Sequence, residues 1–177
     1  MESSWHLQRH RAGFSHGQRG RRLRDQLASQ PDSQGGSPIE LPEINEHNAA
    51  PGTPLNAYTV TYDRAAIEQY LSRSGEPTGP YIEDGKLTVP PGMFLGAYGR
   101  LIHGTFHYEA GVHTASQMTV AKCPPEGTVA TVSGEVVKTF ERNGDRYVQF
   151  LVVVSDEMGD ICARVEHTSI HGLRSRA

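Results

Sequence analysis

The 177-residue sequence lacks the features that identify membrane, secreted and disulfide-bonded proteins. No run approaches the roughly 18 consecutive apolar residues of a membrane-spanning helix, and no apolar segment follows the basic start as it would in a secretory signal. The two cysteines, Cys123 and Cys162, are too few for a disulfide framework, and we interpret them as small buried apolar residues. We therefore expect a cytoplasmic protein with no membrane partner.

Acidic residues are nearly absent from the start of the chain and in excess elsewhere. Residues 1–24 contain six arginines and one acid, Glu2, a net charge of about +5; because the whole chain carries −3, the remainder carries about −8. An acidic folded part argues against nucleic acid as a partner. The arginine-rich start has the composition of a mitochondrial transit peptide as well as that of a solvated tail.

Apolar residues are also scarce in residues 1–52, which are rich in Gly, Ser, Gln, Pro, Arg and His. Such a segment cannot bury enough apolar surface to offset the entropy lost on ordering. We predict a disordered arm, in which residues 21–30 could form a short helix and residues 39–44 could pack on the domain. The folded domain is expected to span residues 53–177.

Two helices are predicted in the first half of that domain. Asp63 is a good N-cap for a helix that Gly75 ends. A second helix begins at Pro90 and Pro91, and it is apolar nearly all round, as is typical of a buried helix. Glycines on or near one of its faces are expected to let a sheet or a ligand approach the backbone closely. These glycines are Gly92, Gly96 and Gly99.

Strands are predicted at residues 58–62, 112–122, 128–140, 146–155 and 160–170. Asn143-Gly144 is a strong hairpin signal between the third and fourth of these. Within the third, alternation predicts that Phe140 shares a face with the apolar residues Ala130, Val132 and Val136. On the last strand, His167 and His171 are expected to face solvent or an interface. This order predicts an α+β domain, in which a curved antiparallel sheet wraps around one long central helix.

Several common catalytic motifs are missing. There is no G-x-S-x-G elbow, and the glycines from Gly92 to Gly99 have the wrong spacing for a dinucleotide fingerprint. His103, His107 and His113 straddle a helix end, a loop and a strand, so we do not expect them to converge on a metal ion. No metal and no separate cofactor is predicted.

Three local patterns nevertheless resemble one family. The first is the loop Gly75-Glu-Pro-Thr-Gly-Pro-Tyr81, and the second is Val89-Pro-Pro-Gly-Met-Phe94. The third joins the strand from Val112 to the Pro124-Pro-Glu-Gly127 turn and the hairpin that follows. Their order and spacing resemble the MaoC-like acyl dehydratases and (R)-specific enoyl-CoA hydratases, which have the hot-dog fold.

The resemblance implies a lyase acting on enoyl thioesters of coenzyme A or of an acyl carrier, as a homodimer or as a heterodimer with a second hot-dog subunit. It implies a catalytic pair, Glu76 and Tyr81. It also implies a substrate-binding set at the start of the central helix and on the next strand: Pro91, Gly92, Met93, Gly96 and His113. In this scheme amides near Gly92 and Met93 hold the thioester oxygen, whose developing charge they would stabilise.

The catalytic loop departs from the family pattern. Glu76 stands in place of aspartate, Tyr81 in place of histidine and Thr78 in place of asparagine. Because the unperturbed pKa of tyrosine is near 10, Tyr81 is a poor base at neutral pH. Three interpretations therefore remain: a hydratase in which Glu76 is the sole acid and base, a thioesterase, and a non-catalytic subunit that binds acyl thioesters beside an active partner.

Overall fold

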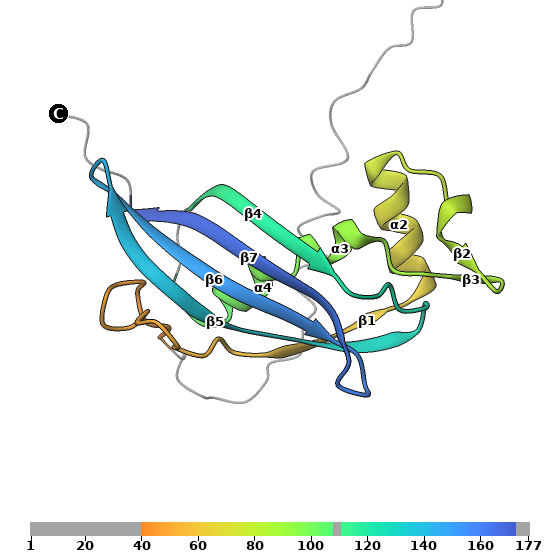
Figure 1. Cartoon of the computed structure of the whole chain (residues 1–177), viewed down its shortest axis with the longest axis horizontal. Coiled ribbons are helices and arrows are strands. Elements are labelled where there is room, and N and C mark those ends of the chain that lie inside the picture. Colours follow the sequence, from red (N-terminus) through yellow and green to blue (C-terminus); the bar gives the residue numbers. More distant parts are fainter. Residues whose placement is uncertain (1–39, 108–110, 173–177) are drawn as a thin grey trace, which may run out of the picture. The chain divides into compact units, whose positions relative to one another are not determined.

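A five-stranded antiparallel sheet, in the order β1–β5–β6–β7–β4, is the main element of the structure (Figure 1). The computed structural model describes residues 40–107 and 111–172. The strands are β1 (Tyr58–Tyr62), β4 (Val112–Val120), β5 (Thr128–Arg142), β6 (Asp145–Ser155) and β7 (Ile161–Gly172). They agree with the predicted strands to within a few residues at each end.

The long strands β5 and β6 are joined by the predicted two-residue turn. Asn143 and Gly144 both have positive φ, 55° and 82°, as a tight hairpin turn requires. A register shift between Val136 and Lys138 interrupts the alternation of β5. Phe140 is consequently exposed and stacks on Tyr147, with ring centroids 4.9 Å apart, so the prediction that it shares the buried face of Val136 is wrong.

Within the described residues, three α-helices accompany the sheet: α2 (Arg64–Ser74), α3 (Pro91–Leu95) and α4 (Tyr98–His103). Asp63 caps α2 by accepting a hydrogen bond from the Ala66 amide at 2.7 Å. The predicted central helix is present as two short pieces, α3 and α4, separated by a turn at residues 96–97. A short 3₁₀ helix, η1 (Gly79–Tyr81), and a small hairpin of β2 (Ile82–Glu83) and β3 (Lys86–Leu87) lie between α2 and α3.

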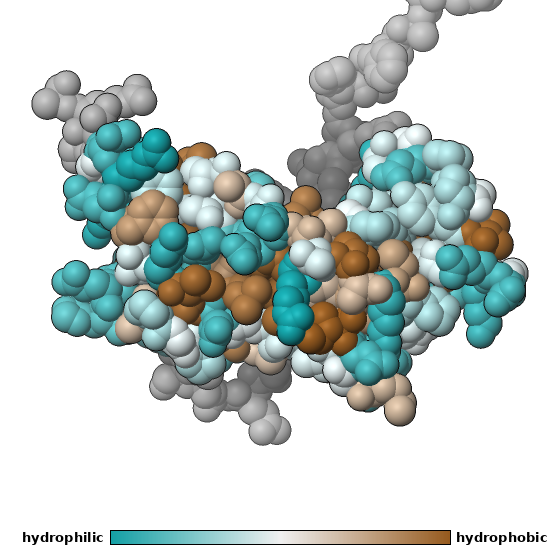
Figure 2. Space-filling model, in the orientation of Figure 1, coloured by the Kyte–Doolittle hydropathy of each residue, from teal (hydrophilic) through white to brown (hydrophobic). Residues whose placement is uncertain are grey.

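The core lies between the inner face of the sheet and the central helix. The helix contributes the buried side chains Phe94, Ala97, Leu101 and Ile102, and the sheet those of Val132, Val136, Val148, Phe150, Val152 and Val165. Gly134 on β5 makes this approach possible, because a Cβ there would lie 2.9 Å from a methyl carbon of Leu101. The outer face carries apolar residues among polar ones (Figure 2).

Residues 40–52 also belong to the packed structure. Ile44 and Ala49 are buried, and the Gly52 amide donates to the Val136 carbonyl at 2.8 Å. Packing therefore begins before the predicted boundary at residue 53. The rest of the predicted arm, residues 1–39, lies outside the described residues, as does the possible helix over residues 21–30.

Candidate functional site

Glu76 is positioned by the way in which α2 ends. Gly75 adopts the left-handed conformation with φ 73°, which few other residues tolerate, and the Glu76 amide donates to the Leu71 carbonyl at 3.0 Å. This C-cap turns the chain back across the end of the helix. The Glu76 side chain is half-buried at the start of the loop that leads to η1.

Tyr81, at the end of η1, points back to this carboxylate. Its hydroxyl donates a hydrogen bond to Glu76 Oε2. That hydrogen bond, followed by burial and by the negative charge of Glu76, raises the pKa of Tyr81 above its ordinary value. Tyr81 therefore stays protonated at neutral pH, and it can orient the carboxylate but cannot replace histidine as a base.

The loop that carries the pair is anchored to the core on its far side. The Thr88 amide and hydroxyl both donate to the Tyr81 carbonyl, at 2.7 and 3.2 Å. The next residue, Val89, is fully buried, and its amide donates to the Pro124 carbonyl at 2.9 Å. The stretch predicted to be a loop thus contains a small hairpin tied to the β4–β5 connection, beside α2 (Figure 1).

The start of α3 lies at this same end of the domain. Pro91, Gly92 and Met93 are half-buried there. The Met93 amide donates to the Pro90 carbonyl at 3.0 Å, so it is already engaged within the turn. A Cβ built on Gly92 would collide with the hydroxyl of Tyr70 and lie 3.0 Å from Tyr70 Cζ. Close approach to Gly92 is therefore made by a side chain from α2.

Sequence reasoning missed this role of Tyr70, which it assigned to the apolar face of α2. The assignment of Tyr70 to the apolar face is correct, because its ring is half-buried and packs on the core. Only the requirement for glycine at position 92 hinted that something approaches the backbone. Tyr70 and Cys123 are also close enough to contribute to the raised pKa of Tyr81.

Gly96 and His113, the other two predicted binding residues, lie in different surroundings. A Cβ on Gly96 would meet only the Met93 carbonyl at 3.8 Å, and one on Gly99 would meet nothing within 4 Å, so no described residue closely approaches either glycine. His113 lies near the start of β4. Cys123, which is close to Tyr81, follows the other end of this strand, and Val120 at that end is seven residues from His113. At about 3.3 Å per residue that separation is roughly 23 Å along the strand.

His113 instead belongs to a second polar cluster, on β4, β7 and α4. His113 Nε2 lies 2.9 Å from Ser116 Oγ, which lies 3.2 Å from His167 Nδ1. His167 Nε2 lies 2.6 Å from Ser169 Oγ, and its ring stacks on Tyr98 with centroids 3.6 Å apart. His167 is fully buried, so the prediction that it faces solvent or an interface is wrong. Burial, followed by repulsion from His113, lowers its pKa to about 4.

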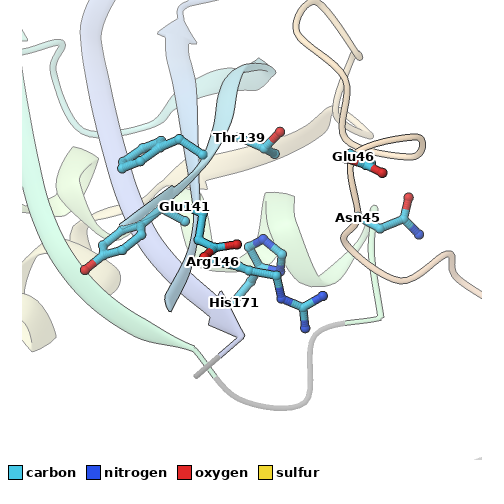
Figure 3. Close-up of a pocket in the computed structure, with 8 residues that line it drawn as sticks. Asn45, Glu46, Thr139, Glu141, Arg146 and His171 are labelled. Carbon is cyan, nitrogen blue, oxygen red and sulfur yellow. The ribbon is translucent and has the colours of Figure 1, made fainter. Parts of the chain in front are cut away.

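A hollow of about 390 Å³ lies at one end of the sheet (Figure 3), and Figure 1 shows α2 at the other end. It opens beside the β5–β6 hairpin and is lined by Asn45, Glu46, Thr139, Phe140, Glu141, Arg146, Tyr147 and His171. Burial and the charge of Arg146 lower the pKa of His171. Because its wall carries carboxylates as well as Arg146, the hollow shows no preference for a charge of one sign.

Metal ligation and membrane insertion find no support in the described residues. Residues 40–107 and 111–172 contain no group of three or more His, Cys, Asp or Glu side chains arranged to hold a metal ion. None of the helices in this part of the chain combines the length and hydrophobicity needed to cross a bilayer. Cys123 and Cys162 are free thiols.

No family model and no curated protein matches the sequence. Solved structures do match the fold. A MaoC-like dehydratase from Rhodospirillum rubrum superposes with a TM-score of 0.58 and 12% identity, covering 73% of this chain and 97% of its own. An (R)-hydratase from A. caviae involved in PHA biosynthesis gives 0.55 and 11%, covering 67% and 94%.

A heteromeric assembly is similar too: the ChsH1–ChsH2 complex from Mycobacterium tuberculosis gives a TM-score of 0.56 and 13% identity, covering 69% of this chain and 98% of the matched chain. The chain has the hot-dog fold. Within it, the Glu76–Tyr81 pair lies on the loops beside the start of the central helix, and the His167 cluster lies under the β4 edge. The fold expected from the sequence is thus confirmed.

Proposed function

We propose that this hot-dog protein acts on acyl thioesters, and that its reaction is the reversible hydration of an enoyl thioester carried by coenzyme A or by an acyl-carrier phosphopantetheine. The observation that carries the proposal is the hydrogen-bonded Glu76–Tyr81 pair, on a loop at the same end of the domain as the start of α3. A carboxylate that is half-buried and held by a phenol is suited to proton transfer.

In the proposed reaction Glu76 takes a proton from a water molecule while the water oxygen bonds to the β-carbon. The electron pair of the double bond moves toward the thioester carbonyl, and the proton is then delivered to the α-carbon. Tyr81 keeps its own proton and fixes the orientation of the carboxylate through its hydrogen bond. The reverse sequence removes water from the 3-hydroxyacyl thioester.

A second candidate is a non-catalytic subunit that binds acyl thioesters beside an active partner. The raised pKa of Tyr81 favours it, because the usual histidine base has no replacement of similar basicity in this pair. The similarity to the heteromeric ChsH1–ChsH2 complex supports the same idea. A second hot-dog subunit, identical or different, would pair along β4, the nine-residue strand at one edge of the sheet.

Crotonyl-CoA separates these candidates and the third, a thioesterase, in one assay. Loss of enoyl absorbance without release of thiol supports the hydratase, whereas release of free thiol identifies a thioesterase. If crotonyl-CoA binds and neither signal appears, the chain is a binding subunit. If the full-length protein neither binds nor converts crotonyl-CoA or its acyl-carrier equivalent, action on acyl thioesters is excluded.

A further inference from the structure

Tyr70 places its hydroxyl group beside the start of α3. Its ring is half-buried against the core, and its Oη lies directly over Gly92. No hydrogen bond joins this hydroxyl to any other group among residues 40–107 and 111–172. Two neighbouring groups at this end of the site are already engaged: Tyr81 with Glu76, and the Met93 amide with the Pro90 carbonyl.

Among the described residues, Glu126 Oε2 is the only buried side-chain polar atom without a partner, so the Tyr70 hydroxyl is reached by solvent and is free to bind a ligand. Gly92 keeps this position open to the hydroxyl, since any side chain there would occupy the same space as Tyr70 Oη. The glycine therefore has a physical role beyond helix flexibility. It lets the tip of Tyr70 reach the backbone at the start of α3, where the resemblance had located backbone donors for the thioester oxygen.

We infer that the Tyr70 hydroxyl binds the carbonyl oxygen of the acyl thioester. The inference rests on the proposed function and names the donor at that site. As negative charge gathers on the carbonyl oxygen, Tyr70 donates a hydrogen bond and retains its proton, while Glu76 moves the proton between water and the α-carbon. Tyr70 then supplies the stabilisation expected from the Met93 amide, which is already engaged with the Pro90 carbonyl.

The position of Tyr70 relative to Tyr81 is consistent with this assignment. The two tyrosines are close enough for Tyr70 to contribute to the raised pKa of Tyr81. A carbonyl bound at Tyr70 would therefore lie close to the Glu76–Tyr81 pair. The proton donor to the carbon skeleton and the hydrogen-bond donor to the oxygen would then face the same thioester.

The first test is Tyr70→Phe, which removes one oxygen atom and keeps the ring over Gly92. With crotonyl-CoA as substrate we expect kcat to fall about 10- to 100-fold with little change in KM, as for a hydrogen bond to a group that becomes charged. The matched control is Tyr147→Phe, which deletes a tyrosine hydroxyl at the opposite end of the sheet and should leave kcat unchanged. A Tyr70→Phe variant with the wild-type kcat, beside a Glu76→Gln variant that is inactive, would overturn the role of Tyr70 and leave the proposed function standing.

A second variant reaches the same hydroxyl by another route. Gly92→Ala places a methyl group where Tyr70 Oη lies, so the hydroxyl must move. We expect a loss of kcat similar to that of Tyr70→Phe, and no additional loss when the two substitutions are combined, because both remove one interaction. Fully additive losses would contradict the inference.

A spectroscopic measurement does not depend on turnover. Butyryl-CoA labelled with carbon-13 at the carbonyl can be bound to each variant, and its carbonyl stretch measured by difference infrared spectroscopy. A hydrogen bond from Tyr70 should lower the frequency in the wild type and in Tyr147→Phe, and Tyr70→Phe should lose that shift. If the wild type binds butyryl-CoA without hydrating crotonyl-CoA, the same shift would support Tyr70 as a ligand-binding residue in a binding subunit. An unshifted carbonyl in the wild type would refute the role of Tyr70. Failure to bind either thioester would refute the proposed function as well.

Discussion

Two polar clusters, one at the Glu76 loop and one under the β4 edge, use their hydrogen-bonding groups in opposite ways. His167 is fully buried, and both of its ring nitrogens lie within hydrogen-bonding distance of serine hydroxyls. At the loop, Glu76 and Tyr81 are half-buried, and the nearby Tyr70 hydroxyl has no partner among the described residues. We call the His167 cluster saturated, because its ring nitrogens have hydrogen-bond partners, and such satisfied polar groups in a core stabilise a fold. We call the Glu76 cluster open, because a polar group without a partner at the surface remains available to a ligand.

This comparison separates two residues that the sequence placed in the same site. Glu76 and His113 were both assigned to substrate chemistry by the resemblance. The structure puts Glu76 in the open cluster and His113 at the margin of the saturated one, where its ring lies 4.7 Å from that of His167. Changes in the open cluster should therefore affect activity, and changes in the saturated cluster should affect stability.

The largest expected effect is that of Glu76→Gln on the hydration of crotonyl-CoA. Removing the sole proton-transfer group should lower kcat by about 10²- to 10⁴-fold, the range typical of general acid–base catalysis. The free energy of unfolding, measured in urea, should change little because the side chain is half-exposed. A Glu76→Gln variant that keeps wild-type activity would contradict the assignment of catalysis to the open cluster.

The next effect is a loss of stability in acid caused by His167. Its pKa is about 4 in the folded protein and near 6.5 when unfolded, so between these values the unfolded chain binds the proton more readily. The free energy of unfolding should therefore fall as the pH is lowered from about 6.5 to about 4, by on the order of 3 kcal/mol in total, and this contribution should level off below pH 4. Urea titrations over this pH range measure it.

His167→Gln provides the control for the acid effect. Glutamine does not titrate, so this part of the pH dependence should disappear, while any contribution from His171 remains. An unchanged acid slope in His167→Gln would show that His167 is not buried in its neutral form.

A smaller effect is expected for Ser169→Ala in the saturated cluster. The substitution leaves His167 Nε2 buried without its hydrogen-bond partner, which typically costs about 1–3 kcal/mol. Chemical denaturation followed by circular dichroism measures this loss. A neutral Ser169→Ala variant would mean that water replaces the serine, and hence that the cluster is not closed.

The smallest effect should be that of Tyr81→Phe on stability. The hydrogen bond to Glu76 joins two half-exposed groups, so water can replace it, and we expect a change within about 0.5 kcal/mol. The same denaturation experiment serves as the measurement. A loss as large as that of Ser169→Ala would show that the loop pair is mainly structural.

Local patterns predicted most of the fold because each rested on nearby residues. The Asp63 cap, the Gly75 stop and the Asn143–Gly144 turn are set by backbone geometry within a few positions, and all three are present. The prediction for Phe140 was wrong because a one-residue bulge in β5 depends on how neighbouring strands pair. The exposure of His167 was mispredicted because burial on β7 depends on Tyr98, which packs over it from the central helix.

For the candidate site, the sequence by itself determined the spacing of Glu76 and Tyr81. Glu76 follows the C-cap of α2 and Tyr81 ends the 3₁₀ helix five positions later, so local backbone geometry brings the two side chains together. The tertiary structure alone decided that Tyr70 reaches Gly92 and that His113 lies in a different cluster. Tyr70 and Gly92, like His113 and His167, are more than 20 positions apart in the sequence, and no local pattern encodes such contacts. Such contacts are fixed by side-chain packing between helix and helix or between helix and sheet, so they appear only when the whole core is assembled.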